Sequence, residues 1–444
     1  MNGPLAERGT LASRRVLVVA HDFPPLRSPQ AIRAWHFVRA LSGEAGEVVV
    51  LCRRPPAGAP APVLAANVRY LATSPGPFES TVDALVAWRR RARGAPSDDV
   101  TPGALSLNWK GLALKRLRRM LDLMVFPDAR RFWVRSAAEA LAALLRESRP
   151  DVAVVMHEPA ASLLLAPMLD RAGVPWIADL ADPVVAPYTP RHWRRRAFAL
   201  EQETLRAATG VAVTNSATAD LLAERHGPWR TPPLILSQGH GEAVEEAPPT
   251  FDAPKDGGPL RLCYTGRLYA FRRIDPVIDA ILAIEGVQLV VACPEPPTAL
   301  LDAARRFPSR FELHGEVAHA KALSLQGSAD ALLSLGNAGT VQSPGKLFEY
   351  FGAARPVLHV ASNRLDPQVG LIAGLRRGLS CDNDVASIAR CIVELRDLKA
   401  ARGMATRFDL SKDAIDRFGW PAIGQALVRA LGRLADDAAL RRRP

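Results

Sequence analysis

Residues 343–358 have the sequence SPGKLFEYFGAARPVL, which joins the start of a helix to the start of a strand. Ser343 suits the N-cap of a helix, and Pro344 suits its first turn. A short apolar run at 331–336 precedes this stretch, and Pro356 opens a second apolar run. The order strand, helix, strand predicts a βαβ unit with parallel strands.

The same alternation of short β-branched runs and helical stretches fills the chain on both sides of this unit. It predicts the α/β class, with two doubly wound parallel sheets of the Rossmann type. In the first half of the chain we expect strands at 16–20, 48–52, 68–72, 152–156, 176–180, 211–215 and 234–237. In the second half we expect strands at 260–266, 287–293, 311–315, 331–336, 356–361 and 378–381.

Changes in composition along the chain predict two domains and a linker. Residues 241–259 are rich in Pro, Gly and acidic side chains and have almost no apolar pattern, so we interpret them as the linker. They separate an N-terminal domain, 1–240, from a C-terminal domain, 260–410, and terminal helices with a basic tail follow at 411–444. At roughly 100–200 residues per domain, 444 residues suffice for two domains with complete cores.

The composition is typical of a globular protein of the cytoplasm. Apolar residues make up 48% of the chain, and no apolar run approaches the roughly 20 residues that cross a membrane. The N-terminal apolar stretch is short and lacks a small-residue cleavage site, so we expect no signal peptide. The five cysteines are scattered without a CxxC pair, which favours reduced thiols. No spacing of His and Cys indicates a metal site, and we expect no metal.

The formal net charge of +12 favours acidic partners such as phosphates or anionic lipid headgroups, unless it reflects an Arg-rich composition alone. Its largest local concentration lies in the helical segment 75–150. Within 105–150, ten Lys and Arg accompany four acidic residues, with Leu, Met, Trp and Phe interleaved. A basic amphipathic helix at 107–126 would lie on an anionic membrane surface. The alternative is an insertion packed on the N-terminal domain with its basic face in water.

The helix start in residues 343–358 has the chemistry of an anion site. The first amides of a helix have no partner within the helix, and the helix dipole favours negative charge there. Gly345 leaves these amides uncovered, Lys346 adds a cation in the same turn, and Glu349 follows on the same face. This helix start therefore suits a phosphate. The alternative for Lys346 and Glu349 is a surface ion pair of little energetic worth.

The same stretch closely resembles the C-terminal motif of retaining glycosyltransferases of family 4. Those enzymes have the GT-B fold, in which two Rossmann-like domains face a cleft, and bacterial members act in surface-polysaccharide assembly. The resemblance implies that Glu349 accepts hydrogen bonds from the ribose of the donor, and that Ser343, Gly345 and Lys346 lie near the donor diphosphate. The chain departs from the motif at Val341, where the family has a further glutamate, so the resemblance does not specify how the donor sugar is recognised.

A second feature is YTGRLYAFRRID at 264–275, where the first strand of the C-terminal domain ends. A reaction that expels a nucleotide diphosphate without metal needs fixed cations on the leaving group. The family has an Arg directly after the Gly and a second basic residue six positions on, and Gly266, Arg267 and Arg273 match this pattern. Arg272 takes the second place if the loop is shifted by one residue. The alternative is a basic loop exposed to water.

The N-terminal domain offers candidates at the ends of its strands. His157 follows the strand at 152–156, where related transferases have a histidine at the donor sugar; the alternative is a histidine satisfied by backbone groups. Asp182 matches an acidic pattern of the family on the acceptor side, or else forms a turn. Ser28 and Arg33, in the first loop, are weaker candidates for contact with an acceptor or a phosphate.

We assign no catalytic or ligand-binding role to two other motifs. FPDARRFW at 126–133 recurs before the fourth strand in similar proteins, and we assign it no role. The trio 382–384, Asp-Asn-Asp, is similar to a metal-binding DxD motif, but it opens a helical stretch. Capping of that helix is the better interpretation.

These features together predict a metal-independent hexosyltransferase that moves a sugar from a UDP- or GDP-sugar to an acceptor held by the N-terminal domain. The donor is a substrate, and no cofactor is expected. A lipid-linked or polysaccharide precursor as acceptor would bring the protein to the inner face of the cell membrane. A nucleotide-sugar epimerase of the same fold and a degenerate binding subunit without catalysis are the alternatives. No nucleic-acid partner is expected, because no recognition motif is present.

Overall fold

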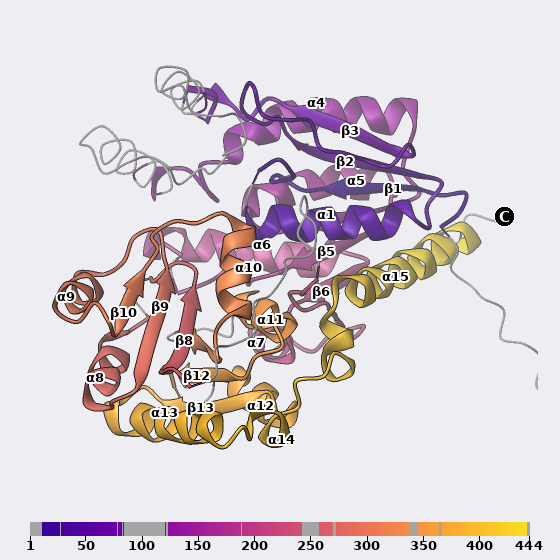
Figure 1. Cartoon of the computed structure of the whole chain (residues 1–444). Helices are drawn as coiled ribbons and strands as arrows, with labels where there is room; N and C mark the ends of the chain where they lie inside the picture. The colour runs from indigo at the N-terminus through magenta and orange to yellow at the C-terminus, as the bar shows by residue number, and fades with distance from the viewer. Residues whose placement is uncertain are drawn as a thin grey trace, which may run out of the picture. The chain divides into compact units, whose positions relative to one another are not determined.

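The chain forms two compact units, shown in the computed structural model of Figure 1. Unit 1 comprises Met1–Ser237 with Ile423–Pro444, and unit 2 comprises Gln238–Ala422. The structure describes residues 11–26, 28–77, 79–81, 83, 120, 123–187, 189–241, 257–269, 272–337, 345–363 and 366–441.

Within the described residues, unit 1 is built on a sheet of seven parallel strands in the order β3-β2-β1-β4-β5-β6-β7. The strands are β1 Arg15–Val19, β2 Glu47–Arg53, β3 Val68–Thr73, β4 Val152–Met156, β5 Trp176–Leu180, β6 Gly210–Val213 and β7 Leu234–Ile235. The helices are α1 Pro29–Ser42, α4 Arg131–Glu147, η1 Ala160–Leu165, α5 Ala166–Arg171, η2 Arg191–Trp193, α6 Arg194–Ala207, α7 Ser216–His226 and most of α15 Trp420–Arg441.

The strands of unit 1 are buried on both faces because helices cover both. Trp133 and Leu141 of α4 pack with Leu17 and Val49 in one core, and the alternate side chains of β1 and β2 face the other way. Figure 1 shows α4 and α1 on opposite sides of these strands. The C-terminal helix α15 approaches α1 so closely that a Cβ on Gly424 would lie 2.4 Å from an α1 side chain.

The described part of unit 2 contains a sheet of six parallel strands in the order β10-β9-β8-β11-β12-β13. The strands are β8 Leu260–Thr265, β9 Val287–Ala292, β10 Phe311–Leu313, β11 Ala331–Leu335, β12 Val357–Ala361 and β13 Gly378–Asp382. The helices are α8 Asp275–Ala283, α9 Thr298–Arg306, α10 His319–Gly327, α11 Gly345–Gly352, α12 Pro367–Gly374, α13 Val385–Ala400, α14 Met404–Arg407 and η3 Asp413–Phe418.

The predicted class, α/β with two doubly wound parallel sheets, is confirmed, and every expected strand is present with small shifts at its ends. Each sheet reverses its strand order once, between β1 and β4 in unit 1 and between β8 and β11 in unit 2. Ligands of open α/β sheets bind outside the carboxyl ends of the strands at such a reversal. The fold therefore locates one candidate site in each unit.

Several expectations concern residues that the structure does not describe. Most of the basic helix expected at 107–126 and of the linker expected at 241–259 lies outside the described residues, and so do Val341, Ser343 and Pro344. The interpretation of the Asp-Asn-Asp trio as a cap is confirmed, because Asp384 accepts a hydrogen bond from the amide of Ser387 at 2.9 Å. None of the helices in the described ranges is long and apolar enough to cross a bilayer.

Candidate functional site

The strand reversal of unit 2 brings the two motifs of the C-terminal half together. Gly266 directly follows β8, and Lys346 lies in the first turn of α11. A Cβ on Gly266 would lie 3.7 Å from Cγ of Lys346, so the two residues are neighbours. Gly266 has φ of +127°, a backbone conformation that other residues rarely adopt. A side chain at this position would strain the turn and cover Lys346.

Glu349 is the centre of a hydrogen-bond network at this strand reversal. Lys346 Nζ lies 2.7 and 3.0 Å from the two carboxylate oxygens of Glu349. The amide nitrogen of Gln326 donates to Glu349 Oε1 and also, at 2.8 Å, to the hydroxyl of Thr265 at the end of β8. The side chains of Lys346 and Glu349 are 37% and 21% exposed, so this pair lies at the surface of the unit.

The protonation state of Glu349 follows from its neighbours. Burial acts to raise the pKa of Glu349, but the ammonium of Lys346, His319 and the hydrogen bond from Gln326 together hold that pKa below its usual range. Glu349 is therefore ionised at neutral pH and acts only as a hydrogen-bond acceptor. A carboxylate in this state suits the hydroxyl groups of a ribose.

The three arginines of the basic loop have different surroundings. Arg272 is half-buried, donates from Nε to Asn337 Oδ1 at 2.8 Å, and donates from a terminal nitrogen to the hydroxyl of Tyr264 at 3.2 Å. Arg267 and Arg273 are exposed. Asn337 follows β11, so the structure ties Arg272 to the strand reversal. The backbone oxygen of Arg273 instead accepts from Asn383, beside α13.

Three residues that support the site could not be recognised from the sequence pattern. Gln326 and Asn337 hold Glu349 and Arg272 from other parts of the chain, and neither belongs to a recognisable motif. Tyr350 lies within the quoted stretch, and its hydroxyl accepts a hydrogen bond from the amide of Thr265 at 2.9 Å. It fixes the end of β8 to α11. The only sequence signal for a role of Tyr350 in the site is its position next to Glu349.

The strand reversal of unit 1 places His157 directly after β4. Its side chain is buried, which lowers its pKa, so the ring is neutral at neutral pH. Within the described residues, Nδ1 of His157 has no hydrogen-bond partner. Glu158, the next residue, has φ of +67°, a strained backbone conformation for a non-glycine residue that is typical of functional sites, and its carboxylate accepts from Gln30.

The other candidates of the first half occupy different environments. Arg33 is 1% exposed and forms a bidentate ion pair with Asp179, with bonds of 2.8 and 2.7 Å. Its expected contact with an acceptor or a phosphate is therefore wrong, because the guanidinium is fully engaged in the core. Ser28 is the N-cap of α1 and accepts from the amide of Ala31. Asp182 lies half-buried in the bend after β5, and its role stays a prediction.

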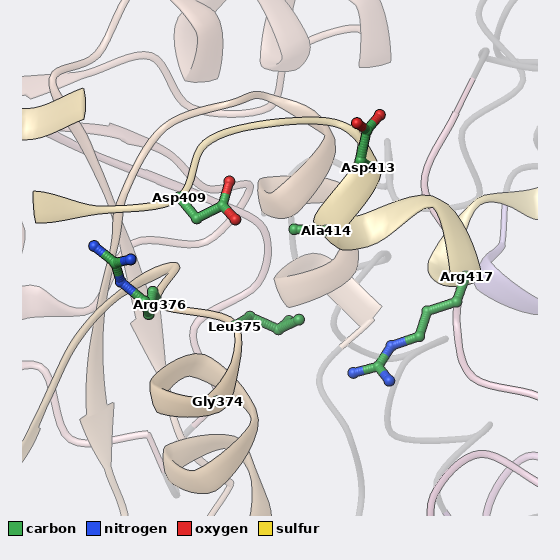
Figure 2. A pocket seen from close by; sticks show the side chains of 7 residues that line it. All are labelled: Gly374, Leu375, Arg376, Asp409, Asp413, Ala414 and Arg417. Carbon is green, nitrogen blue, oxygen red and sulfur yellow. The ribbon is translucent and has the colours of Figure 1, made fainter. Parts of the chain in front are cut away.

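A pocket in unit 2 lies away from these residues (Figure 2). It is formed by the end of α12, the turn at Asp409 and η3. Its lining combines two arginines with two aspartates, and Asp409 already accepts from the hydroxyl of Ser411 at 2.6 Å. Because the pocket adjoins the segment that enters β13, it lies near the amino ends of the strands. Parallel sheets bind ligands at the opposite ends.

The chain matches no family model and no curated protein sequence. It does match solved structures over nearly its whole length. Trehalose 6-phosphate synthase from Burkholderia multivorans has a TM-score of 0.60 at 14% identity, covering 97% of this chain and 100% of that chain. HepE from Anabaena in complex with UDP-glucose has a TM-score of 0.57 at 12% identity, covering 94% and 99%. A UDP-glucosyltransferase from Polygonum tinctorium has a TM-score of 0.53 at 14% identity, covering 95% and 98%. The predicted GT-B fold is confirmed.

Proposed function

We propose that this chain is a glycosyltransferase that binds a nucleotide-diphosphate sugar at the strand reversal of unit 2. One observation carries the proposal: Glu349 and Lys346, at the start of α11, lie beside Gly266 and the basic loop that follows β8. This geometry combines an acceptor for ribose hydroxyls with cations for a diphosphate. Two of the solved structures with the same fold are described as a UDP-glucosyltransferase and as a complex with UDP-glucose, which supports the same class of donor.

In the proposed complex, the ribose hydroxyls donate to the carboxylate of Glu349, and Gln326 keeps that carboxylate oriented. Lys346 then exchanges its ion pair with Glu349 for the negative charge of the diphosphate. The amide of Gly345, the first residue of α11, adds a donor for the same phosphates, and the family resemblance implies a further contact from Ser343. The exchange is favourable because the diphosphate carries more charge than one carboxylate.

The leaving group is stabilised by guanidinium groups in place of a metal ion. When the bond between the anomeric carbon and the diphosphate oxygen breaks, its electron pair leaves with the diphosphate. Arg267, together with Arg272 or Arg273, neutralises that charge. The contacts with Asn337 and Tyr264 favour Arg272, because they hold its guanidinium in place before substrate binds.

We further propose, from the family resemblance, that transfer retains the anomeric configuration and that the enzyme belongs to family 4. His157 would contact the donor sugar, and Asp182 would act on the acceptor side. A neutral, buried imidazole suits a hydrogen bond to a sugar hydroxyl better than it suits a charge. The acceptor would be a lipid-linked or polysaccharide precursor.

The first test is calorimetry of the full chain with UDP and with GDP, followed by a panel of nucleotide sugars with and without EDTA. We expect micromolar to millimolar binding of one nucleotide, and slow hydrolysis or transfer that survives EDTA. Failure to bind any nucleotide would overturn the proposal and leave a non-catalytic subunit. Interconversion of a nucleotide sugar without an acceptor would replace transfer with epimerisation.

A further inference from the structure

A surface of unit 1 combines exposed apolar side chains with a cluster of arginines. Its described residues are Met120 and 123–126 from one segment and 191–196 from a second segment, far away in the sequence. We call it the Trp193 patch. The carbonyl oxygen of Leu123 accepts hydrogen bonds from the rings of His192, at 2.7 Å, and Trp193, at 2.9 Å.

Aromatic stacking completes the junction between the two segments. The rings of Phe126 and Trp193 lie 5.5 Å apart, and the guanidinium of Arg196 lies over both, at 4.8 and 5.3 Å from their centroids. Cation–π contacts of this kind hold the arginine on the aromatic pair. The patch is thus a built surface in which apolar and cationic groups keep fixed places.

The apolar part of the patch is exposed to solvent. The side chains of Met120, Leu123 and Met124 are 55%, 44% and 69% exposed. Their spacing of three and four residues puts them on one side of a helical turn, and the structure assigns helix at all three positions. Large apolar side chains clustered in this way indicate an interaction site.

Four arginines supply most of the charge of the patch, against one acidic residue, Asp122, in the sequence of the first segment. Arg191, Arg194, Arg195 and Arg196 are exposed, and none forms an ion pair with a carboxylate among the described residues. Residues 189–200 contain no acidic side chain, and the next one, Glu201, is fully buried and bonded to Arg225 and His226.

We propose that the Trp193 patch docks unit 1 on an anionic lipid bilayer. Leu123 and Met124 enter the boundary between headgroups and acyl chains, Trp193 lies at the level of the headgroups, and the arginines bind lipid phosphates. An anionic bilayer is the partner that matches both components, because nucleic acid gains nothing from exposed aliphatic side chains. A second copy of the chain would place the four arginines against their own charge.

This proposal differs from the membrane helix expected at 107–126. The Trp193 patch includes the end of that segment, but its arginines lie at 191–196, around the start of α6. No sequence pattern indicated a role for these arginines. It does not rest on the proposed function, because docking is measured without turnover. If both hold, a docked unit 1 brings the enzyme to a lipid-linked acceptor.

The test is cosedimentation of the full chain with phosphatidylcholine vesicles, with and without phosphatidylglycerol. We expect binding only with the anionic lipid. The variant Arg194→Glu/Arg195→Glu should lose at least about tenfold in affinity, since each arginine near an anionic surface contributes roughly fivefold. The matched control Arg305→Glu/Arg306→Glu changes the same charge on α9 of unit 2 and should bind vesicles like the wild type, apart from a small effect of net charge.

The variant Leu123→Ser/Met124→Ser keeps the charge and tests the apolar contact. We expect it to bind anionic vesicles at least about threefold more weakly, with unchanged urea unfolding, because both side chains are exposed. If the two Glu variants lose equal affinity for anionic vesicles, or if the Ser variant binds as tightly as the wild type, net charge alone explains the binding. Either result would overturn the proposal. A dimer that dissociates in the Ser variant, or binding to RNA that matches binding to vesicles, would also overturn it.

Discussion

The two units of this molecule have the same reversal of strand order, but the ion pairs near the two reversals differ in how deeply they are buried. In unit 1, Arg33 and Asp179 neutralise each other at 1% and 0% exposure. In unit 2, Lys346 and Glu349 pair at 37% and 21% exposure, and the guanidinium of Arg267 is exposed. A buried pair is needed for the stability of the fold, because removing one partner leaves an uncompensated buried charge. A half-buried pair at the surface costs less to separate, so a ligand can replace one partner.

The largest expected effect follows from the buried pair. The substitution Arg33→Ala should lower the free energy of unfolding of unit 1 by about 3–5 kcal/mol. It leaves the carboxylate of Asp179 without its bidentate partner, and it leaves the carbonyl oxygens of Leu236 and Ser237 without their donors. Urea unfolding followed by tryptophan fluorescence reports mainly on this unit, because seven of the eight tryptophans belong to it.

An exposed pair in the same unit is the matched control. Arg135 pairs with Glu139 on α4 at 91% and 69% side-chain exposure, and Arg135→Ala should change stability by less than about 0.5 kcal/mol. If Arg33→Ala lowers the free energy of unfolding by no more than this, the buried pair is not needed for the stability of the fold. The contrast drawn between the ion pairs of the two units would then be wrong.

The sequence predicted the elements of the fold because they are local. The strand β4 coincides with its apolar run, since a strand buried on both faces needs a nearly continuous series of β-branched and other apolar side chains. The helix start that we propose as the anion site was also a local pattern. Asp384 as an N-cap is the same kind of inference, since a cap depends on a few neighbouring residues.

The partners of the site residues could not be predicted, because they come from distant parts of the chain. Arg33 and Asp179 are 146 residues apart, and nothing in the loop around Arg33 distinguishes a buried guanidinium from one that binds a ligand. Asn337, which holds Arg272, is 65 residues away from it. Spacing selected Arg273, with Arg272 only if the loop is shifted by one residue, and it could not show that Asn337 and Tyr264 hold the guanidinium of Arg272.

That choice gives the second prediction. Arg272→Ala should lower kcat/KM for transfer by about 10²–10³, as does the loss of one preorganised donor to a developing anion. Arg273→Ala should have an effect of less than about tenfold, because no hydrogen bond to a described residue holds its guanidinium in place as Asn337 and Tyr264 hold that of Arg272. Steady-state kinetics of both variants with the same nucleotide sugar make the comparison. If Arg273→Ala has the larger effect, the anchoring by Asn337 does not mark the residue that acts on the diphosphate.

The third prediction concerns the carboxylate of unit 2. Glu349→Ala should weaken nucleotide binding by about 1.5–3 kcal/mol, the worth of a hydrogen bond to a charged group, and should leave the unfolding of unit 1 unchanged. Calorimetry with UDP or GDP measures the loss. Glu394→Ala is the control, since Glu394 also pairs with a basic residue, Arg407, on the surface of unit 2. Unchanged nucleotide affinity in Glu349→Ala would sink the assignment of Glu349 to the ribose.

The smallest expected effect sharpens the comparison through pH. His36 of α1 is 6% exposed, and burial, aided by Arg39, lowers its pKa to about 3 from 6.5. Between these values the unfolded chain binds a proton at His36 that the folded chain does not, so the stability of unit 1 falls as pH falls. From pH 6.5 to about 5, the free energy of unfolding of the wild type should fall by roughly 1–2 kcal/mol more than that of His36→Gln.

Two other histidines of unit 1 also have shifted pKa values. Burial lowers the pKa of His157, which acts in the same direction, whereas the raised pKa of His21 acts in the opposite direction. Both remain in the variant, so the difference between the two urea curves isolates His36. Equal pH dependence of the two proteins would mean that His36 is protonated in the folded unit.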